Sequence, residues 1–227
     1  MAARRTKRDR IIDAAIELAG DQPWEDVTLT LIAARARLPL AELRREFSSR
    51  NQILGAFVAR IDAEMLAAAG AEDDESTVRD RLFDLIMCRL DALGPFKPAL
   101  KNISGGRPAG PSEAVAGLGH LLQSQGWILD AAGATTPGLS GKIKTCGLAA
   151  LYLDVLSVWL EEDDPGLPRT MARLDRQLRR GERLLECGAA PMALTGRFGS
   201  TIAACARRMR EAAPAAPDTA NDAATDA

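Results

Sequence analysis

The sequence is poor in the side chains on which most metal and catalytic sites depend. It holds a single histidine, His120, a single tyrosine, and four cysteines that are far apart and form no C-x-x-C pair. A zinc site needs clustered thiolates or imidazoles, and a Ser-His-Asp triad would also have to use His120, which lies among apolar neighbours at helical spacing. No Walker phosphate loop, dinucleotide fingerprint or nucleophile elbow is present. We therefore predict no metal site, no cofactor and no enzymatic activity.

Aromatic residues and long apolar runs are also scarce. Only 4% of the chain is aromatic while Ala and Leu dominate, which favours packed helices over a sheet rich in Val, Tyr and Phe. No stretch reaches about 18 uninterrupted apolar residues, so we expect no membrane-spanning helix. The N-terminus is basic and lacks the apolar core of a signal peptide. These absences predict a cytoplasmic protein.

The apolar residues that are present recur at spacings of three and four, and no segment alternates with period two. The pattern predicts an all-α protein, with a loop-rich stretch over 94–111. Ser76 or Thr77 is expected to cap the helix that follows the acidic break at 72–75. The expected helices cover 12–19, 29–36, 40–47, 53–69, 78–93, 112–126, 140–161, 168–186 and 194–211.

Charge is unevenly distributed, although the formal net charge is only −2. Between Arg4 and Arg10 five cations accompany one anion, so the N-terminus is a basic arm. Residues 212–227 carry three aspartates, no cation and no large apolar side chain. Such a segment cannot bury enough surface to order itself, and we expect a disordered acidic tail.

The first fifty residues fit a helix-turn-helix domain. The second and third expected helices are separated only by Arg37-Leu38-Pro39, and Thr28 is placed to cap the second helix. Cations surround the third helix. Together with the basic arm they form the electrostatic pattern expected for double-stranded DNA. The residues predicted to contact DNA are Arg4, Arg5, Lys7, Arg8, Thr28, Arg37, Leu40, Arg44, Arg45 and Arg50.

Residues 7–63 resemble the TetR family of bacterial regulators. The resemblance rests on the run Ile11 to Ala19, on Trp24-Glu25-Asp26-Val27-Thr28, and on Ile32-Ala33, Leu38, Leu43, Phe47-Ser48-Ser49-Arg50 and Ile53-Leu54. It implies an all-helical homodimeric repressor. An N-terminal helix-turn-helix would bind operator DNA, and a larger helical domain would bind a small ligand and form the dimer through its last helices.

The sequence departs from the family pattern at three places. The turn that usually reads Gly-Val-Ser is here Arg37-Leu38-Pro39, so the Ser cap of the third helix is lost. The usual Leu-Tyr-x-His-Phe is here Leu43-Arg44-Arg45-Glu46-Phe47, in which Arg44 replaces the phosphate-binding tyrosine while Glu42 and Glu46 repel the DNA backbone. The phosphate-binding lysine of the fourth helix is here Arg50. A helix-turn-helix that no longer binds DNA is therefore the alternative.

Residues 153–163 and 170–178 more weakly resemble the lipid-binding accessory proteins of ubiquinone biosynthesis, which share the TetR fold and do not generally act as repressors. In 194–211, Leu194, Phe198, Ile202, Cys205 and Met209 lie on one helical face and arginines lie mostly off it. Such a basic amphipathic helix can sit on an anionic membrane, although packing against the protein is the commoner use. This lipid-binding accessory protein is the second functional hypothesis.

The sequence thus predicts three parts: a helix-turn-helix domain over 1–50, a helical ligand-binding and dimerisation domain over 51–211, and the acidic tail over 212–227. An unknown small apolar ligand is expected between the helices of the second part. Its proposed lining is Phe83, Met87, Trp127 and Trp159, although large apolar residues at this spacing also suit a filled core. The expected dimer surface is the helix pair in 148–160 and 167–185, because both appear in the sequence as wide apolar stripes.

Overall fold

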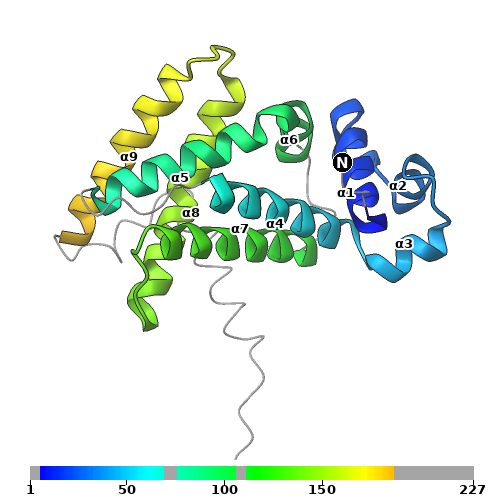
Figure 1. Cartoon of the computed structure of the whole chain (residues 1–227), viewed down its shortest axis with the longest axis horizontal. Coiled ribbons are helices and arrows are strands. Elements are labelled where there is room, and N and C mark those ends of the chain that lie inside the picture. The colour runs from blue at the N-terminus through cyan, green and yellow to red at the C-terminus, as the bar shows by residue number, and fades with distance from the viewer. Residues whose placement is uncertain (1–5, 69–75, 106–110, 187–227) are drawn as a thin grey trace, which may run out of the picture.

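The computed structural model describes residues 6–68, 76–105 and 111–186, and within these ranges the chain is helical with no β-strand (Figure 1). The all-α prediction is confirmed. The elements are α1 (Lys7–Asp21), η1 (Trp24–Asp26), α2 (Leu29–Arg35), α3 (Leu40–Glu46), α4 (Arg50–Ala68), α5 (Val78–Leu93), η2 (Gly94–Phe96), α6 (Lys97–Gly105), α7 (Pro111–Ala131), α8 (Gly138–Glu161) and α9 (Pro168–Glu186).

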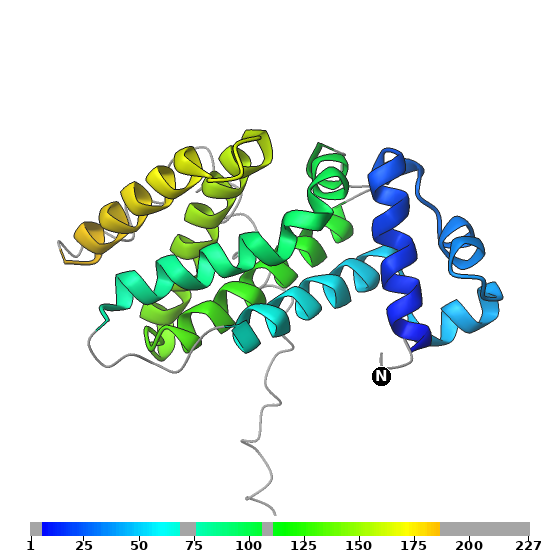
Figure 2. The same cartoon turned by 45° about the horizontal axis from the view of Figure 1, so that its top comes forward.

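Helices α1 to α3 form a small unit at one end of the molecule (Figure 2). A capping box starts α1, because Thr6 Oγ1 accepts from Asp9 N and the Asp9 carboxylate accepts from Thr6 N. The three helices share a core that includes the fully buried side chains Val27, Ile32 and Leu43. These are positions that the helical spacing in the sequence assigned to the core.

Helix α4 leads from this unit into the body, where it packs against α5 and α7, and α8 and α9 form a hairpin beside them (Figure 1). The body has a polar centre within its apolar core. The buried guanidinium of Arg89 on α5 donates to the Asp62 carboxylate on α4, to Ser124 on α7 and to Tyr152 on α8. Since each partner comes from a different helix, this network fixes how the four helices meet.

Three features of the fold differ from the sequence expectations or extend them. Helix α6 occupies the stretch expected to be loop-rich, because Pro95 and Pro98 stand in the first turns of η2 and α6, where proline is tolerated. Helix α7 continues to Ala131, beyond the expected end at residue 126. The predicted helix over 194–211 and the acidic tail lie outside the described residues.

One helix has the composition of a membrane span. Helix α8 is long enough, and its mean hydropathy of 1.5 is high enough, yet it carries core residues such as Tyr152, Val155 and Trp159. Only 33% of its most apolar window is buried within the described chain. Part of its apolar surface is therefore left uncovered by the residues that the structure describes.

Candidate functional site

The turn between α2 and α3 is built around a residue in the left-handed region. Arg37 has φ = 54°, and on either side of it the chain closes with hydrogen bonds from Arg37 N to Ala34 O and from Leu38 N to Ala33 O, both 3.0 Å. Arg10 of α1 donates to the carbonyls of Ala36 and Arg37 and so holds the turn against α1. The turn thus has the shape a glycine would adopt without strain, while a cation occupies the position.

Helix α2 is held at its N-terminus by the N-cap Thr28 and by Arg50 of α4. Thr28 Oγ1 accepts from Leu31 N at 3.2 Å, as expected of an N-cap. Arg50 at the start of α4 donates to the carbonyls of Trp24 and Val27 at 2.9 and 2.8 Å, and its guanidinium lies 5.5 Å from the centre of the Trp24 ring. Its side chain is only 19% exposed. The Arg50 guanidinium thus joins the start of α4 to η1 and to the residue before Thr28, and its phosphate contact stays a prediction.

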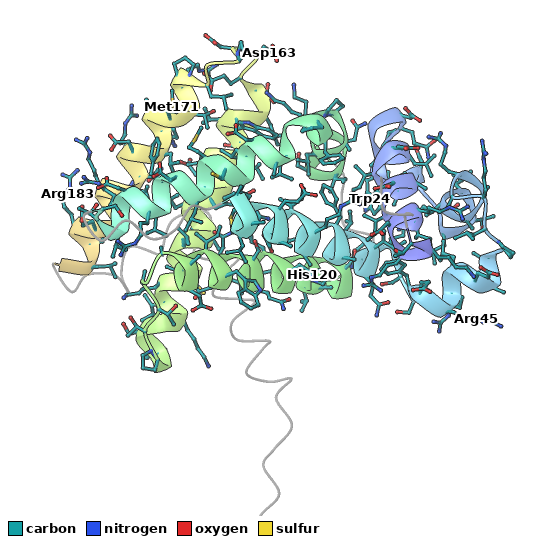
Figure 3. The ribbon with its side chains drawn as sticks, viewed as in Figure 1. Trp24, Arg45, His120, Asp163, Met171 and Arg183 are labelled. Atoms are coloured by element: carbon teal, nitrogen blue, oxygen red, sulfur yellow. The ribbon has the colours of Figure 1, made fainter. Side chains whose placement is uncertain are left out.

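The residue that precedes α3 at its N-cap is Pro39, which provides no side-chain cap, as the sequence predicted. Its outer face carries Leu40, Arg44 and Arg45, all exposed. Within the described chain neither arginine forms a hydrogen bond or an ion pair, and Figure 3 places Arg45 at the outer end of the molecule. Two cations on one exposed helix are therefore available to an anionic partner.

The acidic residues that the sequence placed next to these arginines are only partly a hindrance. Lys7 of α1 pairs with the Glu42 carboxylate at 2.8 Å, and this hydrogen bond lowers the pKa of Glu42 below its ordinary value. Arg8 lies over the Phe47 ring with its guanidinium carbon 4.4 Å from the centroid. Glu46 stays exposed. The charge of Glu42 is thus offset by α1.

Most of the predicted DNA contacts lie on this end of the chain. Those within the described residues and exposed to solvent are Lys7, Arg8, Thr28, Arg37, Leu40, Arg44 and Arg45. Arg4 and Arg5 lie outside the described residues. Arg35, another cation near this surface, pairs with Asp21 and Glu17. The exposed set therefore spans the start of α1, the start of α2 and the whole of α3.

The helix-turn-helix unit is tied to the body by polar contacts that the sequence did not reveal. Asn102 of α6 donates to the carbonyl of Ala19 near the end of α1 at 2.8 Å. Arg60 of α4 pairs with Asp13 of α1 at 2.6 Å, and Arg50 approaches Glu113 of α7 at 3.5 Å. No spacing in the sequence pairs residues so far apart. A shift of α4, α6 or α7 would therefore change the polar contacts that hold α1 and η1 in place.

The four residues predicted to line a ligand pocket are not brought together. Trp159 is buried beneath Lys97, whose ammonium lies 5.0 Å from its ring centre, and Phe83 and Met87 pack against the core. Trp127 is 51% exposed and, with His120 of the same helix, lines a cavity of about 380 Å³ between α4 and α7. The four residues therefore do not line one common cavity in this structure, because helical spacing does not distinguish a core position from a cavity wall.

A larger cavity of about 800 Å³ lies between α5, α7, α8 and α9, at the far end from α3. Leucine is the commonest residue in its walls, with Leu82, Leu148 and Leu178 among them, and charged side chains also line it. None of the four predicted pocket residues lines it. The sequence signal that was available is the mixture of leucines and arginines on α9.

The described residues hold no group of three or more His, Cys, Asp or Glu side chains arranged to bind a metal. Cys88 and Cys146 are half-buried and unbridged, and burial raises the pKa of the Cys88 thiol. The remaining cysteines lie outside the described residues.

Solved structures of other proteins share this fold. A TetR transcriptional regulator from Nitrosomonas europaea superposes with a TM-score of 0.62 at 25% identity, over 78% of this chain and 98% of that one. A second TetR regulator, from Rhodococcus sp. RHA1, gives 0.57 at 20% identity, over 76% of this chain and 93% of that one. No protein-family model and no curated protein matches the chain. The chain has the fold of the TetR-family transcriptional regulators.

Proposed function

We propose that this chain, with its TetR-type regulator fold, is a DNA-binding transcriptional repressor that acts as a homodimer and leaves its operator when a small ligand binds. The observation that carries the proposal is the exposed face of α3, where Arg44 and Arg45 form no hydrogen bond or ion pair within the described chain. Two such cations gain little from the fold itself. They gain several charge-assisted hydrogen bonds from nucleic acid.

The proposed complex places α3 in the major groove. Arg44 and Arg45 reach base edges and the neighbouring phosphates, and Leu40 at the start of α3 offers an apolar contact such as a thymine methyl. Thr28 lies just before α2 and Arg37 just after it, and in the proposed complex both face the sugar–phosphate backbone. Lys7 and Arg8 extend the cationic surface toward the basic arm. The Lys7–Glu42 pair supports this docking, because it offsets the carboxylate nearest the backbone.

Two copies are needed, because a single helix-turn-helix covers too few base pairs for specific binding. A two-fold dimer would present two α3 helices about 34–36 Å apart, one turn of DNA. The uncovered apolar surface of α8 supports a dimer through this helix. Helix α9 supports it less, since its buried side chains are the single stripe of Thr170, Leu174 and Leu178 and its outer face is rich in arginine. We therefore place the centre of the interface on α8.

Fluorescence anisotropy against the chain's own upstream region tests the proposal. Arg45→Ala should weaken specific binding by about 1–3 kcal/mol, because it removes a base-edge contact. Arg176→Ala is the matched control, since Arg176 is an exposed arginine on α9 without a partner in the described chain. It should bind as the parent protein does.

Two outcomes would count against the repressor. Equal affinity for a random duplex would leave only non-specific attraction to phosphate, and no binding at low salt would favour a helix-turn-helix no longer used on DNA. The second outcome, joined to sedimentation with anionic vesicles, would favour the lipid-binding accessory protein. Residues 194–211, on which that membrane contact depends, lie outside the described residues.

A further inference from the structure

The larger of the two cavities described above has a chemical character that the proposed release by a small ligand leaves unspecified. Its volume of about 800 Å³ falls within the usual range for small-molecule sites, about 300–1,000 Å³. Leu82, Leu148, Leu151 and Leu178 supply apolar wall from three helices. At its edge Val78 and Leu185 are 40% and 48% exposed. An apolar body fits such walls, and its burial would cover side chains that now face water.

The charges in this cavity favour one sign. Both of its carboxylates are already paired: Asp154 accepts from Arg173 at 2.5 Å and from Gln177, and Glu182 pairs with Arg79 at 3.4 Å. The hydrogen bond from Arg173 holds the pKa of Asp154 below its ordinary value. Neither carboxylate therefore needs a cationic ligand.

Two cations of the lining, Lys144 and Arg180, form no ion pair among the described residues. Lys144 donates to Ala134 O at 3.2 Å and to Thr136 Oγ1 at 2.6 Å, both neutral acceptors. An ammonium has three donors, so one is left. Arg180 forms no hydrogen bond or ion pair with the described chain, although its charge helps to lower the pKa of Asp154, a carboxylate already bonded to Arg173. Lys144 stands on α8 and Arg180 on α9, and both line the cavity.

We propose that the cavity between α5, α7, α8 and α9 binds an amphipathic anion: a molecule with an apolar chain or ring system and a single acidic head group. The apolar part lies along the leucines, and the head group accepts hydrogen bonds from Lys144 and Arg180. The claim that this anion is the effector rests on the proposed function. The claim that the cavity binds such an anion does not.

The chain's own C-terminal part is a poorer occupant on charge. Residues 187–211 contain four arginines and one glutamate, which would bring further positive charge to a site whose unpaired groups are cations. Residues 212–227 are acidic but have no large apolar side chain for the leucines. A free amphipathic anion satisfies both requirements at once.

The smaller cavity beside Trp127 is a weaker candidate for such a ligand. Its polar wall includes Asp62 and Ser124, which bond to each other at 2.8 Å and both accept from Arg89. Every charge there is thus part of the network that joins the helices. The larger cavity differs because two of its cations, Lys144 and Arg180, form no ion pair within the described chain.

The site is also placed to influence α1. Val78, Arg79 and Leu82, in the first turns of α5, form part of its wall. At its other end α5 runs directly into η2 and α6, and α6 packs against α1, where Asn102 bonds to Ala19 O. A ligand that moves α5 therefore has a continuous packed route to the helix-turn-helix unit.

Calorimetric titration of the full chain with decanoate, decan-1-ol and decylammonium tests the head-group assignment. The three probes share one alkyl chain, so only the head group differs. Decanoate, below its micelle-forming range, should bind with the highest affinity and raise the melting temperature, decanol should bind more weakly, and decylammonium weakest. Equal binding of all three, or preference for decylammonium, would overturn the proposal.

Variants then locate the site. Lys144→Met should weaken decanoate binding by about tenfold or more, with little effect on decanol, and Lys144→Arg should retain it. The matched control is Lys142→Met on the same helix, exposed and outside the cavity lining. Unchanged decanoate affinity in Lys144→Met would refute the assignment.

A cavity-filling variant keeps the test independent of folding defects. A side chain added at Gly147 meets no atom within 4 Å at its Cβ, and Gly147 lines the cavity. Gly147→Leu should therefore fold, since leucine suits a helix better than glycine, yet lose decanoate binding. If this variant melts well below the parent and the parent binds no decanoate, the cavity is already filled by the chain's own C-terminal part and the proposal fails.

DNA anisotropy in the same preparations separates the two proposals. If decanoate does not bind while DNA does, the ligand assignment fails and the repressor proposal stands. If decanoate binds through Lys144 to a protein that does not bind DNA, the ligand site stands and the repressor proposal fails.

Discussion

Arg37→Gly is expected to make the protein more stable and at the same time a weaker DNA binder. Arg37 adopts φ = 54° in the turn between α2 and α3. A side chain in this region costs roughly 1–2 kcal/mol, since Cβ crowds the following carbonyl oxygen. Glycine removes that strain but gives the unfolded chain more freedom, which costs about 0.5–1 kcal/mol. The net gain is about 0.5–1 kcal/mol, a rise of roughly 1–4 °C in melting temperature for a chain of this size.

The DNA effect has the opposite sign because it depends on the charge. Arg37 is exposed beside α3, where we propose a phosphate contact. Losing it should weaken binding about equally for all sequences and reduce the slope of log K against log salt by about 1. Anisotropy at several salt concentrations measures this slope, and thermal and urea unfolding measure the stability.

Arg37→Ala separates the two effects. Alanine removes the charge but keeps a Cβ in the left-handed conformation, so it should reproduce the DNA loss of Arg37→Gly without its gain in stability. The two hydrogen bonds that close the turn use backbone atoms and are available to every variant. An Arg37→Gly protein no more stable than the alanine variant would refute the argument from strain. An unchanged salt slope in both variants would remove Arg37 from the DNA surface.

Two further predictions concern α8 and α9. The Glu162 carboxylate is buried and accepts hydrogen bonds from Arg169 N at 2.7 Å and from Thr170 N at 2.8 Å. Burial alone would raise the pKa of Glu162. The two backbone hydrogen bonds and the one from the Thr170 hydroxyl outweigh burial, so the pKa lies below its ordinary value of 4.5. Its stabilisation is therefore present above pH 4.5 and lost as the pH falls through the lowered pKa, so Glu162→Gln should melt lower than the parent at pH 7 and converge with it in acid. Leu153, half-exposed on α8 outside the core cluster, should be part of the dimer face; Leu153→Glu should give a mass near 24.2 kDa by light scattering where the parent gives twice that, and Leu139→Glu, outside the expected interface, should leave the dimer intact. A parent that is itself a monomer would contradict the interface.

The sequence was most informative where one helix face meets one core. The stripes at 12–19, 29–36 and 40–47 predicted α1, α2 and α3, and Thr28 and Thr77 are caps as expected. Helix α6 was missed because its nine residues follow a Gly-Pro pair and include Pro98. The same residues that end a helix can stand in the first turn of another, and only the packing of α6 against α1 decides between the two.

The candidate site was predictable to the extent that it depends on local sequence. The exposure of Arg44 and Arg45 follows from the position of α3. The hydrogen bonds of Arg50, by contrast, go to carbonyls of Trp24 and Val27, more than twenty residues away, which no local pattern reveals. The leucines and arginines of α9 were visible in the sequence, but the position of the cavity was not predictable from them. Leu148 contributes to both the core and the cavity wall, and a periodic pattern records that a side chain is apolar without recording what stands opposite.

The departures from the family turn act together on one surface. Arg37 brings strain, and Pro39 leaves α3 without a side-chain cap, so the sequence gives up stability twice within three residues. Arg10 offsets part of this by bonding to the Ala36 and Arg37 carbonyls, and Lys7 offsets the charge of Glu42. Both compensations come from α1, and the side chains of Arg37, Arg44 and Arg45 form no hydrogen bond or ion pair in the described chain. A turn kept at this cost, with its cations unpaired, is better explained by an anionic partner than by the fold alone.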